Sequence, residues 1–378
     1  MLSRRRDPKL TFDESIEAKI EAVIERIDQA GKWDEDAEDK LSTALTDATM
    51  RSAPTVADAW IKMGRSYLKK MDRFTRGFEK QLRKDYGPGL DRMQTFIAVT
   101  ADLGNSYTKS DRASRREPYY FRALSGLHAR ACRVANEVHC LLEHGYPRAA
   151  LARTRTLHEL SVVATVLAEH ETTHADLAER YVLHETILNS GDARVYQERA
   201  SRLGYTPFTP EFIESLSDDF DDLVERFGKP YKRPFGWAAD LLGNGDPKFD
   251  QLENLADLAH MRGHYKWATR EVHADSKGLR LNTIERGGEY AYLTGVTNVG
   301  LADPAAIAVA ALQSVTIALM LQPEDASPSA NLNCASLSHM SRSIKELFMA
   351  GEERIAVRED SLQARLARKR RPVSNQRE

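Results

Sequence analysis

The sequence predicts a mainly α protein, a multi-helix bundle with a small hairpin or ordered loop near residues 276–300. Apolar residues recur at helical spacing through nearly the whole chain. Glycine and proline stand where helices would stop and start, as at Gly145 and Pro147. Only 276–300 departs from this pattern, with alternating residues on either side of Gly287-Gly288. We find no internal repeat and no Gly-rich phosphate loop after a strand.

The first hundred residues predict two kinds of amphipathic helix. Ile16, Ile20, Val23, Ile24 and Ile27 form one apolar stripe. Trp60, Met63, Tyr67, Met71, Phe74 and Phe78 form another, at steps that suit a helix lying along another helix. Residues 12–40 hold eleven Asp/Glu and four Lys/Arg, whereas 62–84 hold nine Lys/Arg and two acids. The basic helix is therefore either a phosphate-binding ridge or a neutralising neighbour of the acidic helices.

The remaining pattern divides the chain into four parts. We expect an N-terminal helical region at 1–105, a polar linker at 106–118, a helical core domain at 119–350, and a charged C-terminal helix and tail at 351–378. A break is expected at Asp85-Tyr86-Gly87-Pro88-Gly89. The later helices are expected at 119–144, 147–169, 174–203, 209–227, 248–262, 303–321 and 334–370.

Composition indicates an ordinary soluble chain. It has 378 residues, 42% hydrophobic and 29% charged, which suffice for one large or two medium domains. We expect a cytoplasmic location and no membrane partner, because MLSRRRDPKL is not a secretory signal and no run of eighteen apolar residues exists. Cys132, Cys140 and Cys334 are expected to be buried apolar residues without disulfides. The basic stretch 365–372 is expected to be a solvated tail, with nucleic-acid contact as the alternative.

One short motif matches the zinc-peptidase spacing: His170-Glu171-Thr172-Thr173-His174. Such a site needs both histidines on one face of an uninterrupted helix. Two threonines fill the middle here, and Thr173 with Asp176 three residues later is typical of a new helix start. We therefore interpret the stretch as an exposed turn and keep the peptidase as a minor alternative.

Two polar clusters are the main candidate sites. Arg153, Arg155, His158 and Glu159 fall within two turns of an otherwise apolar helix, where charged groups need partners. Tyr265, Lys266, Trp267, Arg270 and His273 combine stacking surfaces with hydrogen-bond donors, as a nucleotide pocket would. Trp267 in the core and His273 as a helix cap is the alternative. If the two helices are neighbours, one cleft would hold Arg153, Arg155, His158, Glu159, Trp267 and His273.

These positions carry two resemblances. Gly145, Ala149 and Arg155-Thr-Leu-x-Glu159, with a second element from His264-Tyr265-Lys266-Trp267 through Glu271-Val272-His273, resemble a helical bacterial family of unknown function. That resemblance covers roughly 119–300 and implies a helical bundle without an activity. Arg153-Thr-Arg-Thr-Leu-His158 is similar to the Arg-x4-6-His mark of HEPN-type nucleases.

The HEPN resemblance implies metal-independent RNA cleavage, usually across a homodimer, and a role in bacterial stress or phage defence. A histidine that titrates near neutral pH can move the 2′-hydroxyl proton of ribose, and an arginine can clamp the phosphate. The hypothesis makes His158 and Arg153 catalytic, with help from Arg155 and Glu159, and needs no metal or cofactor. RNA or a nucleotide and a second copy of the chain would be the partners. The alternative is a non-catalytic binding or scaffold protein whose polar clusters brace helices.

Overall fold

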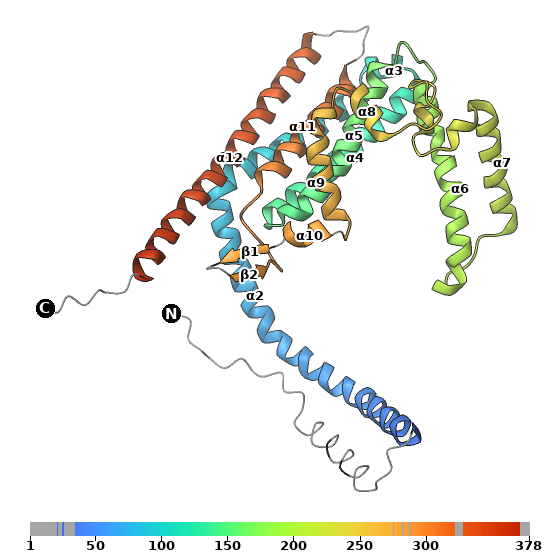
Figure 1. The fold of residues 1–378 in the computed structure, drawn as a ribbon. Helices are drawn as coiled ribbons and strands as arrows, with labels where there is room; N and C mark the ends of the chain where they lie inside the picture. Colours follow the sequence, from blue (N-terminus) through green and yellow to red (C-terminus); the bar gives the residue numbers. More distant parts are fainter. Residues whose placement is uncertain are drawn as a thin grey trace. The chain divides into compact units, whose positions relative to one another are not determined.

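The computed structural model describes residues 21, 25, 35–274, 276–281, 283–286, 289–321 and 328–370. In order, the elements are α2 (Glu35–Thr108), α3 (Asp111–Arg115), α4 (Pro118–Glu143), α5 (Pro147–Glu169), α6 (Leu177–Leu203), α7 (Pro210–Phe227), the 3₁₀ turns η1 (Lys229–Lys232) and η2 (Gly236–Ala238), α8 (Phe249–Leu255), η3 (Ala259–Met261), α9 (Arg262–Val272), α10 (Ser276–Leu281), β1 (Thr283–Arg286), β2 (Glu289–Tyr292), α11 (Ala302–Met320) and α12 (Pro328–Arg370). The mainly α fold is confirmed (Figure 1).

The chain forms two compact units, residues 1–77 and 78–378. The predicted linker at 106–118 falls inside the second unit, where it contains α3. Its polar composition is misleading because one side of the segment is buried: Tyr107, Ala113 and Arg116 are all inside. The expected apolar stripe of Ile16, Ile20, Val23, Ile24 and Ile27 lies outside the described residues.

The predicted break at 85–89 is absent, since α2 runs through Pro88 as one helix. Burial explains why the helix continues. Residues spaced along one face of its C-terminal part are almost fully buried, namely Leu82, Tyr86, Leu90, Met93, Phe96 and Ile97. Packing of an amphipathic face provides most of the stability of a helix in a protein, and here it outweighs the local glycine and proline signals.

Two glycines let α2 and α12 approach closely. A Cβ at Gly89 would lie 3.0 Å from Cδ2 of Phe348, and one at Gly351 would lie 2.5 Å from Cδ1 of Tyr86. The two rings also contact each other, with centroids 5.7 Å apart. Each aromatic ring therefore occupies the space that a side chain would need on the opposite helix.

The core of the second unit is built around α11, which packs against α4, α5 and α12. Among the described residues, α11 is the one helix long and apolar enough to cross a membrane, and 67% of that window is buried within the protein. Its apolar surface therefore has partners inside the fold. Cys132 is buried as expected, but Cys140 is exposed because it lies on the outer side of α4, and Cys334 is half-buried.

The joint between α4 and α5 forms as predicted. Gly145 has the left-handed φ of 77°, and Pro147 occupies the first turn of α5. Gly145 also accepts a hydrogen bond from the Thr297 amide at 2.9 Å. Downstream, α6 and α7 lie side by side as a helical pair (Figure 1).

The hairpin near 276–300 is confirmed, with β1 and β2 antiparallel and Arg286 opposite Glu289. The preceding residues form α10, which the alternating pattern did not predict. The helix expected at 248–262 is instead divided into α8, η3 and α9. Asp257 marks the division, because its φ of 53° cannot continue a right-handed helix.

Candidate functional site

A cleft of about 960 Å³ lies between α4, α5 and α6, and residues from the 234–265 segment line part of it. Arg122 and Arg130 of α4 lie two turns apart along one side, with Gly126 between them. Both arginines are exposed, and neither has a carboxylate partner among the described residues. On the α6 side the lining includes Glu185, Asn189 and Asp192. The cleft therefore has free guanidinium groups along α4 and carboxylates along α6.

Three side chains of this cleft form a connected polar group. Arg155 Nε donates to Glu159 Oε1 at 2.9 Å, one helical turn away on α5. The Tyr265 hydroxyl of α9 donates to the same oxygen, also at 2.9 Å. The Arg155 guanidinium lies over the Tyr265 ring, 5.1 Å from its centroid. Burial, followed by the charge of Glu159, raises the pKa of Tyr265 to about 12, so the phenol stays protonated at neutral pH.

Aromatic side chains extend this group along the cleft. Phe249 and Tyr265 lie with ring centroids 5.1 Å apart, and Phe235 lies 5.8 Å from Phe249. All three line the cleft and are half-buried. Flat apolar surfaces next to arginines are the combination on which a nucleobase stacks.

His158 lies behind this wall and does not line the cleft. The residue is only 4% exposed, and its ring contacts Tyr265 and Phe249. Its Nε2 shares a hydrogen bond of 2.7 Å with Oε1 of Glu253, which is 1% exposed. The expectation of a solvent-facing imidazole is therefore wrong. The physical reason is helical phase: His158 is three residues from Arg155 but points to α8, where a buried carboxylate partners it.

Burial shifts both members of this pair toward their uncharged forms. It lowers the pKa of His158 to about 4, helped by the positive charge of Arg262. It raises the pKa of Glu253 to about 7, with the charge of Glu159 adding to the effect. Arg262 Nη1 lies 2.7 Å from the second oxygen of Glu253, which keeps a cation beside the carboxyl group. His158 and Glu253 are thus a buried pair, and the half-buried Arg262 contacts Glu253 from one side.

Of the remaining predicted site residues, only Tyr265 lines the cleft. Arg153 points elsewhere and pairs with Glu137 of α4 at 2.6 Å. Trp267 is 52% exposed and contacts His264 edge-to-face, so the alternative interpretation of Trp267 as a core residue is wrong. His273 is the C-cap of α9, as its alternative interpretation predicted. Of the second predicted cluster, Tyr265 lines the cleft, whereas Lys266, Trp267, Arg270 and His273 do not.

α5 and α9 are neighbours, which was the condition for a shared cleft, but the cleft holds fewer of the expected residues. Arg155 and Glu159 belong to it, and Arg153, His158, Trp267 and His273 do not. A helix turns 100° per residue, so residues close in sequence look in different directions. That rotation separates Arg155 from both Arg153 and His158.

The HETTH stretch forms a turn, as predicted, but only Thr172 and Thr173 are exposed, whereas His170, Glu171 and His174 are half-buried. α5 ends at Glu169, and α6 begins at Leu177 rather than beside Thr173. Glu171 pairs with Arg116, whose Nη2 lies 2.5 Å from Oε2 and whose side chain is fully buried. The motif therefore lacks the continuous helix that a zinc peptidase places under its two histidines. Among the residues that the structure describes, no group of three or more metal-ligating side chains comes together.

Several residues of the site were missed in the sequence. Arg122 and Arg130 carry a usable signal, because they lie eight residues apart on an amphipathic helix with a glycine between them. Glu253 carries none, since its partner His158 is 95 residues away. Phe249 reads simply as an apolar residue of a short helix.

The fold and this cleft define a class: a mainly helical protein in which polar clusters join the helices around a mixed-charge groove. Residues 121–290 match a family model described as a family of unknown function, DUF5677. The match includes most of α4 and all of α5 to α9, so it contains the whole candidate site. It confirms the resemblance to a family of unknown function that the sequence suggested. No curated protein and no solved structure matches the chain.

Proposed function

We propose that the cleft binds a nucleotide or a short segment of single-stranded RNA. One observation carries this proposal: the same cleft is lined by two free guanidinium groups, those of Arg122 and Arg130, and by the adjacent rings of Phe249 and Tyr265. Guanidinium groups bind phosphate through parallel hydrogen bonds. Aromatic rings stack on any base, each stack contributing about 1–3 kcal/mol.

The carboxylates on the α6 side restrict how such a ligand lies. Glu185 and Asp192 repel phosphate but accept hydrogen bonds from base amino groups or ribose hydroxyls. Phosphates are therefore placed along α4 and the sugar or base edges along α6. Arg155 is already neutralised by Glu159, so it supports the Tyr265 ring instead of supplying a free charge.

Binding is tested by titrating AMP and a fluorescein-labelled oligouridine of about six nucleotides into the protein at low salt. Arg122→Gln with Arg130→Gln is expected to weaken RNA binding by about tenfold or more and to reduce the salt dependence. Arg133→Gln is the matched control, because this exposed α4 arginine does not line the cleft. Equal binding by the double variant and the wild type would contradict the proposal.

A metal-independent ribonuclease in the same cleft is the second candidate, and one contact favours it. His158 is held by a carboxylate in the way that a general base is oriented by its partner. Because Tyr265 and Phe249 cover His158, the reaction would require these rings to move apart. The test is cleavage of single-stranded RNA in EDTA by wild type and by His158→Gln. Full activity in the variant would remove His158 from the reaction, and inactivity of both would leave binding alone.

The contacts of α5 also support a bracing role for the polar clusters. Arg153 joins α5 to α4, Tyr265 joins it to α9, and Glu253 joins it to α8. A scaffold function through these contacts predicts lower stability on substitution and no response to nucleotides. The AMP and RNA titrations therefore separate the scaffold from the binding protein.

A further inference from the structure

The first unit carries an apolar stripe that the described residues leave exposed. Trp60, Met63, Tyr67, Met71 and Phe74 follow each other on α2 at steps of three and four residues. All five are exposed, Tyr67 by 51% and Phe74 by 60%. Single exposed apolar residues are ordinary, but a continuous stripe of large ones marks an interaction surface. The spacing is that of a helix that packs lengthwise on another helix.

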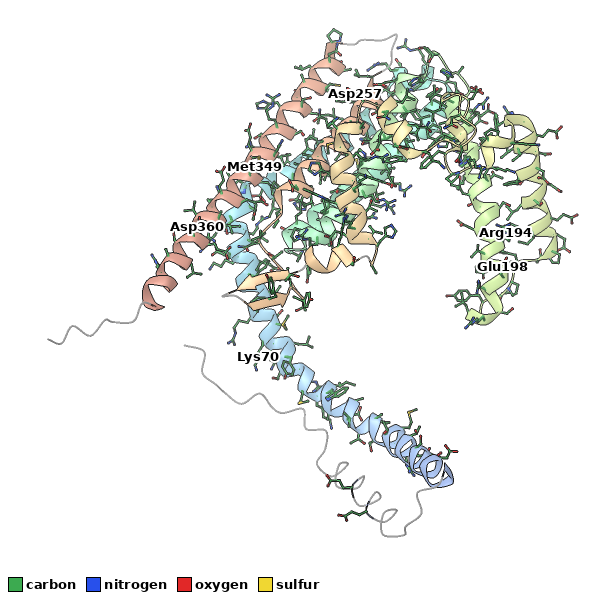
Figure 2. The ribbon with its side chains drawn as sticks, in the orientation of Figure 1. Lys70, Arg194, Glu198, Asp257, Met349 and Asp360 are labelled. Atoms are coloured by element: carbon green, nitrogen blue, oxygen red, sulfur yellow. The ribbon has the colours of Figure 1, made fainter. Side chains whose placement is uncertain are left out.

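The charges along α2 indicate which partner fits. Residues 38–47 carry three acids and one lysine, whereas 68–77 carry four Lys/Arg and one acid. Lys70, labelled in Figure 2, belongs to the basic end. A second α2 running antiparallel would place the acidic end of each copy against the basic end of the other. A parallel partner would put like charges together at both ends.

Side-chain size fixes the register of such a pair. By sequence, positions 41, 44, 48, 52 and 55 repeat the 3, 4, 4, 3 spacing of the stripe and hold Leu, Ala, Ala, Ser and Thr. Residue 60 then faces residue 55 of the other copy, and residue 63 faces residue 52. Trp60, Met63, Tyr67 and Met71 then face the smaller Thr55, Ser52, Ala48 and Ala44, and Phe74 faces Leu41. Large residues opposite small ones let facing helices fill space without voids. The register that centres Tyr67 on itself would instead set Arg65 beside Lys69.

We propose that two copies of the chain associate through α2 as an antiparallel, offset helix pair that buries the stripe from Trp60 to Phe74. The proposal is independent of what the cleft in the second unit binds. The contact is isologous, so each copy contributes the same acidic and basic ends and the pair closes as a dimer. About 34 residues of helix, roughly 50 Å, lie in contact.

The first test is the mass of the full chain in solution. At tens of micromolar the wild type is expected to sediment as a dimer, and the dimer is expected to weaken severalfold between 0.1 and 0.5 M NaCl. Tyr67→Glu with Met71→Glu is expected to give a monomer with unchanged helical circular dichroism. Ser66→Glu, a quarter turn off the stripe, is expected to remain a dimer. A monomeric wild type, or a dimer that survives Tyr67→Glu with Met71→Glu, would overturn the proposal.

The second test is the register, measured by disulfide formation after Cys140→Ser removes the exposed thiol. Ser52→Cys with Met63→Cys is expected to form a covalent dimer on mild oxidation, because the two positions face each other across the pair. Tyr67→Cys alone is expected to stay uncrosslinked. Efficient crosslinking through Tyr67→Cys alone would show the centred register and overturn the offset one.

Discussion

Two polar clusters on α5, less than one turn apart, differ in almost every physical respect. Arg155 and Glu159 face the cleft, pair with each other and leave room for a ligand. His158 faces inward and shares its hydrogen bond with the buried Glu253. The first cluster is screened by water, whereas the second is held in a low-dielectric interior where an unpaired charge is costly. The comparison teaches that a polar cluster facing a cleft and a buried structural brace can occupy the same short stretch of helix.

The largest difference between the clusters is expected when one carboxylate is removed from each. Glu253→Ala leaves the buried His158 imidazole without its hydrogen-bond partner and the half-buried Arg262 without its carboxylate, and is expected to lower the free energy of unfolding by about 1–3 kcal/mol. Glu159→Ala, in the half-exposed cluster, is expected to cost about 1 kcal/mol or less. Urea denaturation of both variants measures the contrast. Similar losses of unfolding free energy in the two variants would contradict the distinction between the buried cluster and the cluster that faces the cleft.

A second, smaller contrast is expected in the dependence of stability on pH. The lowered pKa of His158 makes stability fall as pH drops from 6.5 toward about 4. The raised pKa of Glu253 gives the opposite sign, with stability lost as pH rises from 4.5 through about 7. The two slopes oppose each other between pH 4.5 and 6.5 in the wild type.

His158→Gln removes one of the opposing slopes. Stability of this variant is expected to decrease steadily from pH 5 to pH 8, because only the folded state keeps a proton on Glu253. Denaturation midpoints across that range measure it, with Arg155→Gln as a control that leaves the buried pair intact. A profile for His158→Gln parallel to the wild type would show that the imidazole and the carboxyl group do not oppose each other.

The smallest change in unfolding free energy and RNA affinity is expected from Tyr265→Phe, a substitution in the cluster that faces the cleft. The substitution removes the hydroxyl that donates to Glu159 but keeps the ring beneath Arg155. We expect a loss of about 1 kcal/mol in unfolding free energy and little change in RNA affinity. Tyr265→Ala, which removes the stacking surface, is expected to weaken RNA binding about tenfold. Equal affinities for Tyr265→Phe and Tyr265→Ala would exclude the ring from the bound complex.

Much of the fold was readable because helical periodicity is a local property. The α4–α5 joint at Gly145 and Pro147 followed from two residue types whose backbone preferences are strong. The break expected at Pro88 failed because burial of Tyr86 and Leu90 overrides a local signal. The division at Asp257 was missed because a left-handed aspartate has no distinctive sequence mark.

Only part of the candidate site could be predicted from the sequence, because spacing along one helix does not specify contacts with other helices. Sequence spacing placed Arg155 and Glu159 together correctly, since a helix brings positions i and i+4 to one face. It could not tell which way His158 points, because that depends on Glu253 of α8. The spacing of Arg122 and Arg130 puts them on one helix face but does not show that α5 and α6 form a cleft beside it. Contacts between distant segments are the information that spacing alone does not contain.

The ring of Tyr86 on α2 packs against Gly351 of α12, and the ring of Phe348 on α12 packs against Gly89 of α2. These two contacts prevent α12 from sliding along α2. Sliding α12 by one turn would drive a ring into a Cβ, so only one axial setting is sterically open. The setting also aligns Arg358 with the carboxylate of Asp85, 2.5 Å away, near the start of the exposed C-terminal turns. Because Gly89 and Gly351 have no side chains, the facing rings fit against them, and this fit fixes the axial position of the whole C-terminal helix.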